Sequence, residues 1–296
     1  VSTQSTGGAS TTEIKVRLFG GQNSGQTTWL KQLSIIYKNG FSDLEREHLK
    51  TLIVQSYVND CKQMIQQLQN VPAQLQPTIS AIQALNSEQP IFLTSELSQC
   101  FNQLVNFDQF QALPKPENFD FISTRIPQLQ KELPSNEDIL KAHIQMHSED
   151  FQFKLNNRTF IFTTSQTPTK FFIFFVSAID FEGLQKSLDD FSAIVNSQEY
   201  CKTNFILCFT KIDLLEKRLQ QTEFKQNCNY YEGENTAKDI LAFMKQQFAE
   251  NNKVNVKLRS WDVINAEQVN NKMMEDIAHK IMKFAVEAAM KEGGLM

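Results

Sequence analysis

The sequence predicts an α/β protein whose mostly parallel sheet carries a phosphate-binding loop, with an all-helical domain inserted after the first helix. Three observations support this prediction. An alternating strand runs directly into a glycine-bearing loop and a helix. A Gln-rich stretch with scattered prolines and few β-branched runs comes next. Farther along, continuously apolar strands alternate with helix-length segments, the pattern of a sheet covered on both faces.

The first elements are a strand, a loop and a helix. Residues 14–19 (IKVRLF) alternate apolar and polar side chains, which predicts a strand. The loop 20–27 (GGQNSGQT) follows without a spacer, and WLKQLSIIY over 29–37 is compatible with a helix. A strand, glycine loop and helix in this order form a unit that binds phosphate in many proteins.

The inserted segment is predicted to be helical throughout. Ser42 and Glu45 have the spacing of a capping box, and apolar residues at helical spacing follow them. This long helix is expected to end near Asn70, just before Pro72. Short apolar-periodic segments separated by prolines predict a small helical bundle over 73–135.

The remaining strands and the last helix come after Pro134. Asn156-Asn157 tolerates the positive φ of a tight turn, so the strands on either side should pair antiparallel. The expected strands are 151–155, 158–162, 171–179, 204–210 and 254–258, and the expected last helix is 266–290, stopped by Gly293-Gly294. We therefore expect a disordered lead at 1–12, a sheet domain from 13–40 and 137–296, and a helical domain at 41–136.

Composition excludes several classes of function. Lys and Arg number 29 against 33 Asp and Glu, so the chain lacks the basic excess of nucleic-acid-binding proteins. Its five cysteines form no C-x-x-C pair, which favours a reducing, cytoplasmic setting. The longest apolar run is too short to cross a bilayer, and the start shows neither a signal peptide nor a myristoylation motif.

The loop fits the phosphate-loop pattern G-x-x-x-x-G-K-[ST] except that Gln26 stands where lysine is expected. Glycines let backbone amides converge on a phosphate at a helix N-terminus, and the hydroxyl of Thr27 can ligate Mg²⁺. The alternative is an ordinary glycine-containing turn. The candidate nucleotide-binding residues of this loop are Gly20, Gly21, Gln22, Asn23, Ser24, Gly25, Gln26, Thr27 and Thr28.

A second motif, TKID, follows the apolar strand 204–210 at the sheet edge where ligands bind in open α/β folds. It fits the [NT]-K-x-D element of GTPases, with Thr210, Lys211 and Asp213 as candidate site residues. The Asp213 carboxylate would accept hydrogen bonds from guanine N1 and N2, which selects guanine over adenine, and the Lys211 stem would pack over the base. The alternative is a surface Lys-x-Asp turn.

At this point the chain resembles the alpha subunits of heterotrimeric G proteins over nearly its whole length. LFGGQNSGQTTWLKQLSIIYKNGFSDLEREHLKTLI is similar to the phosphate loop, first helix and inserted helix of that family, and GFS-x-x-E-R stands especially close. LPSNEDILKA resembles the second linker and KEGGLM the receptor-binding tail. The resemblance implies a Ras-like P-loop GTPase fold with an inserted all-helical domain that closes over GTP or GDP.

The resemblance also implies that most catalytic groups are replaced. Aligned on Asp138-Ile139-Leu140, the catalytic arginine position holds His143, and the Mg²⁺-binding threonine becomes Met146. Thr163 stands at the position of the family's acidic Mg²⁺ anchor, and most of the switch II helix is missing. Gln166 stands near the position of the water-positioning glutamine. A thioether is a poor ligand for Mg²⁺.

Magnitudes separate the possible functions. An arginine finger contributes roughly 10³ to 10⁵ in rate, whereas losing one charge-assisted bond to phosphate costs about 1.5 to 3 kcal/mol. We therefore expect a pseudo-GTPase scaffold with weak or lost guanine-nucleotide binding, weak Mg²⁺ binding and impaired hydrolysis. The alternatives are a slow but working GTPase switch in receptor signalling and a nucleotide-free structural subunit.

The expected partners are proteins. The resemblance implies that a receptor or regulator contacts the C-terminal helix and tail. The family's βγ subunits contact an N-terminal helix and switch II; because the first is absent and the second truncated, we expect no conventional βγ heterotrimer. The expected location is the cytoplasm, with the cytoplasmic face of a membrane as the alternative.

Overall fold

The computed structural model describes most of the chain. The described residues are 12–21, 23–86, 89–144, 150–155, 158–165, 169, 171–253, 261–266 and 271–292. The chain divides into a sheet unit, Val1–Tyr37 with His147–Met296, and a helical unit, Lys38–Met146. Three boundaries differ from our expectation. Thr12 belongs to the first strand rather than to the lead. Residues 38–40 and 137–146, expected in the sheet domain, group with the helical unit.

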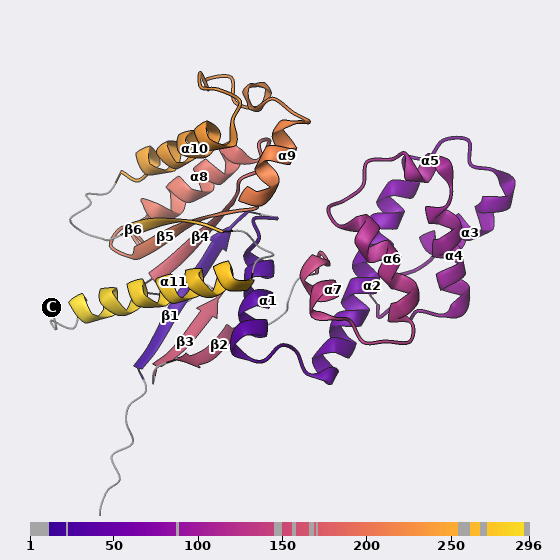
Figure 1. Cartoon of the computed structure of the whole chain (residues 1–296), viewed down its shortest axis with the longest axis horizontal. Coiled ribbons are helices and arrows are strands. Elements are labelled where there is room, and N and C mark those ends of the chain that lie inside the picture. Colours follow the sequence, from indigo (N-terminus) through magenta and orange to yellow (C-terminus); the bar gives the residue numbers. More distant parts are fainter. Residues whose placement is uncertain are drawn as a thin grey trace, which may run out of the picture. The chain divides into compact units, whose positions relative to one another are not determined.

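The sheet unit is built on a sheet whose described part has six strands, in the order β2-β3-β1-β4-β5-β6 (Figure 1). β2 pairs antiparallel with β3, and the other neighbouring pairs are parallel. This confirms the predicted α/β class. The strands are β1 (Thr12–Gly20), β2 (Asp150–Leu155), β3 (Arg158–Thr163), β4 (Phe171–Ser177), β5 (Asn204–Thr210) and β6 (Trp261–Asn265).

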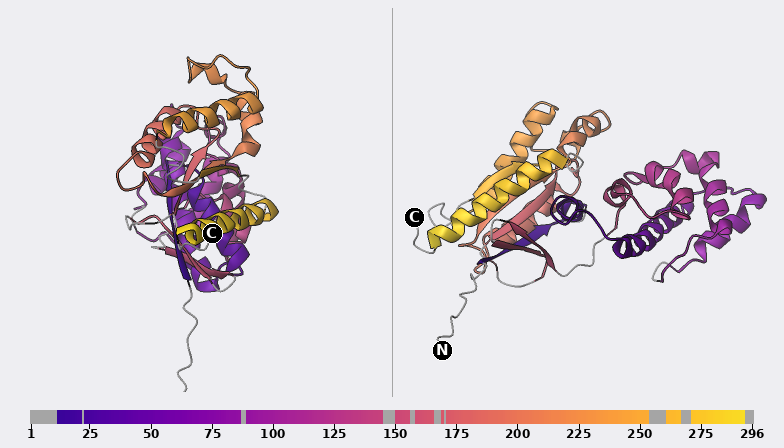
Figure 2. Two further views of the ribbon diagram at one scale, coloured as in Figure 1. Left: turned by 90° about the vertical axis from the view of Figure 1, so that its left-hand side faces the viewer. Right: turned by 60° about the horizontal axis from the view of Figure 1, so that its bottom comes forward.

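Helices cover both faces of this sheet (Figures 1 and 2). They are α1 (Gln26–Tyr37), α8 (Leu184–Val195), α9 (Leu215–Leu219), α10 (Ala237–Asn251) and α11 (Asn271–Glu292), with short turns η2 (Ile212–Leu214) and η3 (Phe224–Gln226). α1 and α11 pack on one face, and α8 and α10 on the other. Strand β4 is buried at every position because its alternate side chains enter both cores.

The connection from β3 to β4 is short. Thr163 at the end of β3 is level with Arg17 of β1, and Phe171 at the start of β4 is level with Val16. Residues 164–170 therefore have only to pass across β1. They are too few for two turns of helix, since an α-helix takes 3.6 residues per turn.

The last strand differs from the prediction. We expected it at 254–258, which lies outside the described residues, but the strand that pairs with β5 is β6, Trp261–Asn265. The Trp261 ring stacks on Phe205 of β5, with centroids 5.6 Å apart and planes 14° apart. The alternation of VNVKL could not show this cross-strand contact, which favours the tryptophan-bearing segment.

The helical unit contains the remaining helices, coloured from violet to magenta in Figure 1. They are α2 (Asp43–Ile65), η1 (Ala73–Leu75), α3 (Gln76–Gln83), α4 (Ser95–Val105), α5 (Asp108–Gln111), α6 (Phe119–Leu129) and α7 (Asn136–Lys141). Ser42 and Glu45 form the expected capping box of α2. The helix ends at Ile65, before the expected Asn70, because its last turn tightens: the amides of Gln67 and Leu68 bond to carbonyls three residues back.

Arg46 joins the segment before α2 to the segment before α7. Its guanidinium donates to the carbonyl oxygens of Phe41 (3.1 Å) and Pro134 (2.5 Å) and to Asn136 Oδ1 (2.6 Å). Gly40 lies so close that an added Cβ would be 3.6 Å from the guanidinium. The GFS-x-x-E-R segment and the second linker, far apart in sequence, are therefore joined by one side chain.

A buried ion pair stabilises the other side of the second linker. Asp138 in α7 has no exposed side-chain surface and accepts hydrogen bonds from Arg125 Nε (2.8 Å) and Nη2 (3.1 Å) of α6. It also caps α7 by accepting from the amide and hydroxyl of Ser135, both at 2.8 Å. Burial alone would raise the pKa of Asp138, but these donors outweigh it and hold the pKa below its ordinary value.

Candidate functional site

The phosphate loop joins the end of β1 to the start of α1. Asn23 and Gly25 have φ values of 60° and 88°, and such alternation lets successive backbone N–H groups form a concave anion-binding nest. The Ser24 amide bonds to the Gly21 carbonyl at 3.3 Å, and the first helical bond runs from Trp29 to Gly25. The amides at the N-terminus of α1 thus begin where the loop ends, as a phosphate site requires.

Gly20 allows the loop to lie close to the sheet. A Cβ at this position would be 2.9 Å from the carbonyl oxygen of Phe175 in β4 and 2.6 Å from the Ser24 hydroxyl. Any larger residue would push the loop off the strand. The Ser24 hydroxyl is buried and has no hydrogen-bond partner among the described atoms, so the loop holds one unused donor. The phosphate loop therefore suits an anion that fits closely against its backbone.

The TKID motif begins at the end of β5. Thr210 is buried, Lys211 adopts the left-handed conformation (φ 57°), and Asp213 is exposed in η2. A left-handed non-glycine residue costs roughly 1–2 kcal/mol, so the surrounding structure must hold this turn in place. The turn leaves the Asp213 carboxylate open to a ligand.

One hydrogen bond connects the two motifs. Thr210 Oγ1 donates to the Ser24 carbonyl at 2.6 Å and lies 3.2 Å from the Val176 carbonyl of β4. The Thr210 carbonyl in turn accepts from the Ala178 amide at 2.9 Å. The structure therefore brings the predicted phosphate loop and TKID motif together at one edge of the sheet. This contact spans 186 positions, and no local pattern in the sequence indicates it.

The position expected to anchor a metal is occupied by a neutral, engaged side chain. Thr163 is 1% exposed, its Oγ1 lies 2.8 Å from Ser165 Oγ, and it accepts from the Ser165 amide at 3.0 Å. Within the described ranges, no group of three or more His, Cys, Asp or Glu side chains could hold a metal ion. Thr163 therefore offers Mg²⁺ no carboxylate, so within the described residues the metal would depend on the Thr27 hydroxyl and on phosphate and water oxygens.

Comparison with known proteins decides the family. A family model described as "G-protein alpha subunit" matches residues 2–284. The chain belongs to this family. Its relatives include a guanine nucleotide-binding protein subunit alpha of Emericella nidulans, 24% identical over 75% of this chain and 74% of that protein. A guanine nucleotide-binding protein alpha-1 subunit of Neurospora crassa is 22% identical over the same shares.

Membership in the G-protein alpha subunit family confirms the resemblance read from the sequence. Proteins of this family act in signalling, generally bind GTP or GDP with Mg²⁺, and interact with receptors, regulators and βγ subunits. In the part of the chain that the structure describes, no helix is long and apolar enough to span a membrane.

Three expected site residues lie outside the described residues: Gln22 of the phosphate loop, Met146, and Gln166. His143, expected at the position of the family's catalytic arginine, is described. It is exposed in the helical unit just after α7, where its carbonyl accepts a hydrogen bond from Ser56 of α2 at 3.0 Å. The His143 backbone is therefore tied to the long first helix of the inserted domain.

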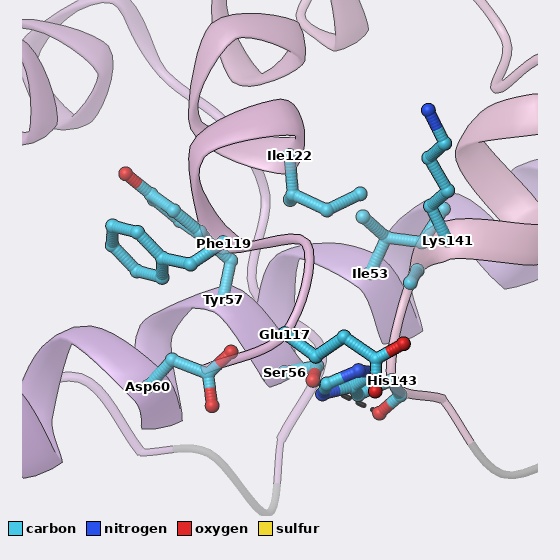
Figure 3. A pocket seen from close by; sticks show the side chains of 10 residues that line it. Ile53, Ser56, Tyr57, Asp60, Glu117, Phe119, Ile122, Lys141 and His143 are labelled. Carbon is cyan, nitrogen blue, oxygen red and sulfur yellow. Dashed lines mark hydrogen bonds between the residues drawn. The ribbon is translucent and has the colours of Figure 1, made fainter. Parts of the chain in front are cut away.

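His143 lines a small pocket in the helical unit (Figure 3). α2 contributes Ser56, Tyr57 and Asp60, and the segments around α6 and α7 contribute Glu117 and Lys141. The Lys141 ammonium points away, to Glu137 at 2.7 Å and over the Phe121 ring at 3.9 Å. Burial raises the pKa of Asp60 to about 6.

Replacing Asp60 with asparagine should change how the helical unit responds to pH. The pKa of Asp60 is about 3.9 in an unfolded chain and about 6 in the fold. The folded state therefore loses stability as pH rises through this window, because the carboxyl ionises more readily in the unfolded chain. Asp60→Asn should therefore match the wild type near pH 4 and be more stable above pH 6. Hydrogen exchange of peptides from 38–146, compared at several pH values, measures this difference.

Asp108→Asn is the matched control, because Asp108 is exposed at the start of α5 in the same unit. Between pH 4 and 6.5, hydrogen exchange in this variant should depend on pH as it does in the wild type. A pH profile for Asp60→Asn that is parallel to that of the wild type would show that Asp60 titrates normally.

Proposed function

We propose that this chain is a divergent G-protein alpha subunit that signals through protein contacts, with weak guanine-nucleotide binding and without efficient GTP hydrolysis. The observation that supports this proposal most directly is the short β3–β4 connection. In a family whose switch II lies between these strands, the seven residues 164–170 are too few for two turns of a helix that responds to a γ-phosphate.

The chemistry of the individual positions agrees with the proposal. Gln26 offers no ammonium to the phosphates, Thr163 no carboxylate to a metal, and His143 no permanent cation to a transition state. An arginine in that role contributes roughly 10³ to 10⁵ in rate, which a neutral imidazole does not supply. Retained backbone geometry and a retained TKID motif support some remaining affinity for guanine.

The protein contacts are proposed to involve the C-terminal helix α11. One face of this helix is buried against the sheet through Ile281, Met282 and Ala285. His279, Lys280 and Lys283 are exposed. A receptor or regulator would therefore bind the exposed side of α11 without disturbing the core. A conventional βγ heterotrimer is not part of this proposal, because its switch II contact surface is shortened.

Single-turnover phosphate release from GTP, measured on the full chain, tests the proposal. We expect release no faster than from GTP in buffer, in both the wild type and Gln166→Ala. Release that is faster in the wild type and lost in Gln166→Ala would instead establish the slow GTPase. Denaturing the purified protein and separating any released nucleotide by chromatography distinguishes a nucleotide-carrying scaffold from a nucleotide-free structural subunit.

A further inference from the structure

The phosphate loop of this chain carries no charged side chain. The loop itself, GGQNSGQTT, therefore offers a bound phosphate only backbone N–H groups, hydroxyls and amides. The one lysine of α1, Lys31, is buried, and burial lowers its pKa to about 7. The helix that follows the loop therefore supplies its dipole and at most part of a charge at neutral pH.

The described residues on the metal side of the site, Thr27 and Thr163, are neutral as well. Thr163 stands where the family has its acidic anchor, and its hydroxyl is already engaged by Ser165. Thr27, in the first turn of α1, offers one hydroxyl. Mg²⁺ that stays with the nucleotide would therefore find one neutral hydroxyl and no carboxylate among these groups, whereas it is normally bound through carboxylates as well as phosphates. The cation of the phosphate loop and the anion of the metal site are thus replaced together.

We propose that the phosphate loop binds a guanine nucleoside diphosphate as the metal-free anion, so that Mg²⁺ competes with the protein for the nucleotide instead of strengthening the complex. This inference rests on the proposed function and specifies the ligand of the same site. Thr210 supports it, because its bond to the Ser24 carbonyl fixes the loop against the TKID motif without any metal.

The same arrangement sets the order of affinities. Backbone N–H groups and a helix N-terminus favour an anion by partial charges, and their number is fixed by the loop. A third phosphate adds negative charge without adding a donor in the described loop. GTP should therefore bind no more tightly than GDP, in contrast to a site that uses a lysine and Mg²⁺ to hold the γ-phosphate.

Titration of the full chain with a fluorescent GDP analogue, in excess EDTA and in excess MgCl₂, tests the inference. We expect tighter binding in EDTA. In MgCl₂ the apparent affinity should fall by the factor by which Mg²⁺ lowers the concentration of free nucleotide in that buffer. Equal or tighter binding in MgCl₂ would overturn the inference.

A variant gives a second, independent readout. Gln26→Lys adds one cation to the phosphate loop and should tighten GDP binding in EDTA by about ten- to hundredfold, the value of one charge-assisted hydrogen bond. Gln246→Lys, the same change at an exposed position of α10, should leave the affinity unchanged. If Gln26→Lys does not tighten binding, the phosphates do not lie at this loop.

The outcomes separate this inference from the proposed function. Undetectable GDP binding in both buffers would overturn the metal-free site but leave a non-hydrolysing scaffold intact. GDP binding that Mg²⁺ strengthens, without release of phosphate from GTP, would likewise overturn the metal-free site and leave the non-hydrolysing scaffold intact. Mg²⁺-strengthened binding together with phosphate release would overturn both.

Discussion

Replacing Arg125 with alanine is expected to destabilise the helical unit by about 3–5 kcal/mol, the usual cost of removing one partner from a buried ion pair. The variant leaves the Asp138 carboxylate enclosed, with only Ser135 to satisfy it. Both tryptophans of the chain, Trp29 and Trp261, lie in the sheet unit. Hydrogen exchange of peptides from 38–146 should therefore detect the loss, while tryptophan fluorescence stays at its wild-type transition.

Glu132 supplies the matched control. It is the other acidic partner of Arg125, at 3.8 Å, but its side chain is 62% exposed. Glu132→Gln should cost no more than about 1 kcal/mol, as exposed pairs do. The pKa of Asp138 is lowered in the fold, so the stability it contributes is lost as pH falls below the pKa of an unfolded aspartate, about 3.9. The difference in stability between Arg125→Ala and the wild type should become smaller in that pH range. A difference that does not depend on pH would show that loss of the ion pair is not its cause.

Trp29→Ala is expected to destabilise the sheet unit by about 3–5 kcal/mol, as large-to-small changes of buried aromatic residues do. Trp29 is 1% exposed, one turn after the phosphate loop, and its ring contacts Phe162 and Phe175 with centroids 5.0 and 5.6 Å apart. Fluorescence of the remaining Trp261 during denaturation with urea measures the change. Because this helix turn carries the loop, GDP binding should weaken with it.

Trp29→Phe separates ring packing from hydrogen bonding. The indole Nε1 is buried and makes no hydrogen bond to any described group. Phenylalanine removes that unsatisfied donor and keeps most of the aromatic contact, so its cost should be well below that of alanine. Equal losses for the two variants would mean that the indole nitrogen has a partner the described residues do not include.

The order of strands and helices was predictable because periodicity is local. Capping at Ser42, the alternation of 14–19 and the apolar strand 204–210 each depend on a few neighbouring residues, and the structure has elements at all three places. The strand at Trp261–Asn265 was not predicted, whereas the strand predicted at 254–258 lies outside the described residues. Pairing with β5 at Trp261, far away in sequence, decides that strand.

The candidate site was predictable in its parts but not in its connections. The motifs name the loop and TKID residues, yet the Thr210 bond to Ser24 depends on how β1, β4 and β5 lie side by side. The Arg125–Asp138 pair likewise depends on the packing of two helices. Long-range contacts of this kind leave no periodic trace in a single sequence, so they emerge only from the folded chain.

Arg46 gives the inserted domain a property of modular design. Because one guanidinium bonds to Phe41, just before α2, and to Pro134, just before α7, the first and last parts of the domain are held together at a single point. A module whose two ends are neighbours can be lengthened, exchanged or excised during evolution without pulling its host apart. The host fold and the insert are therefore free to diverge at different speeds.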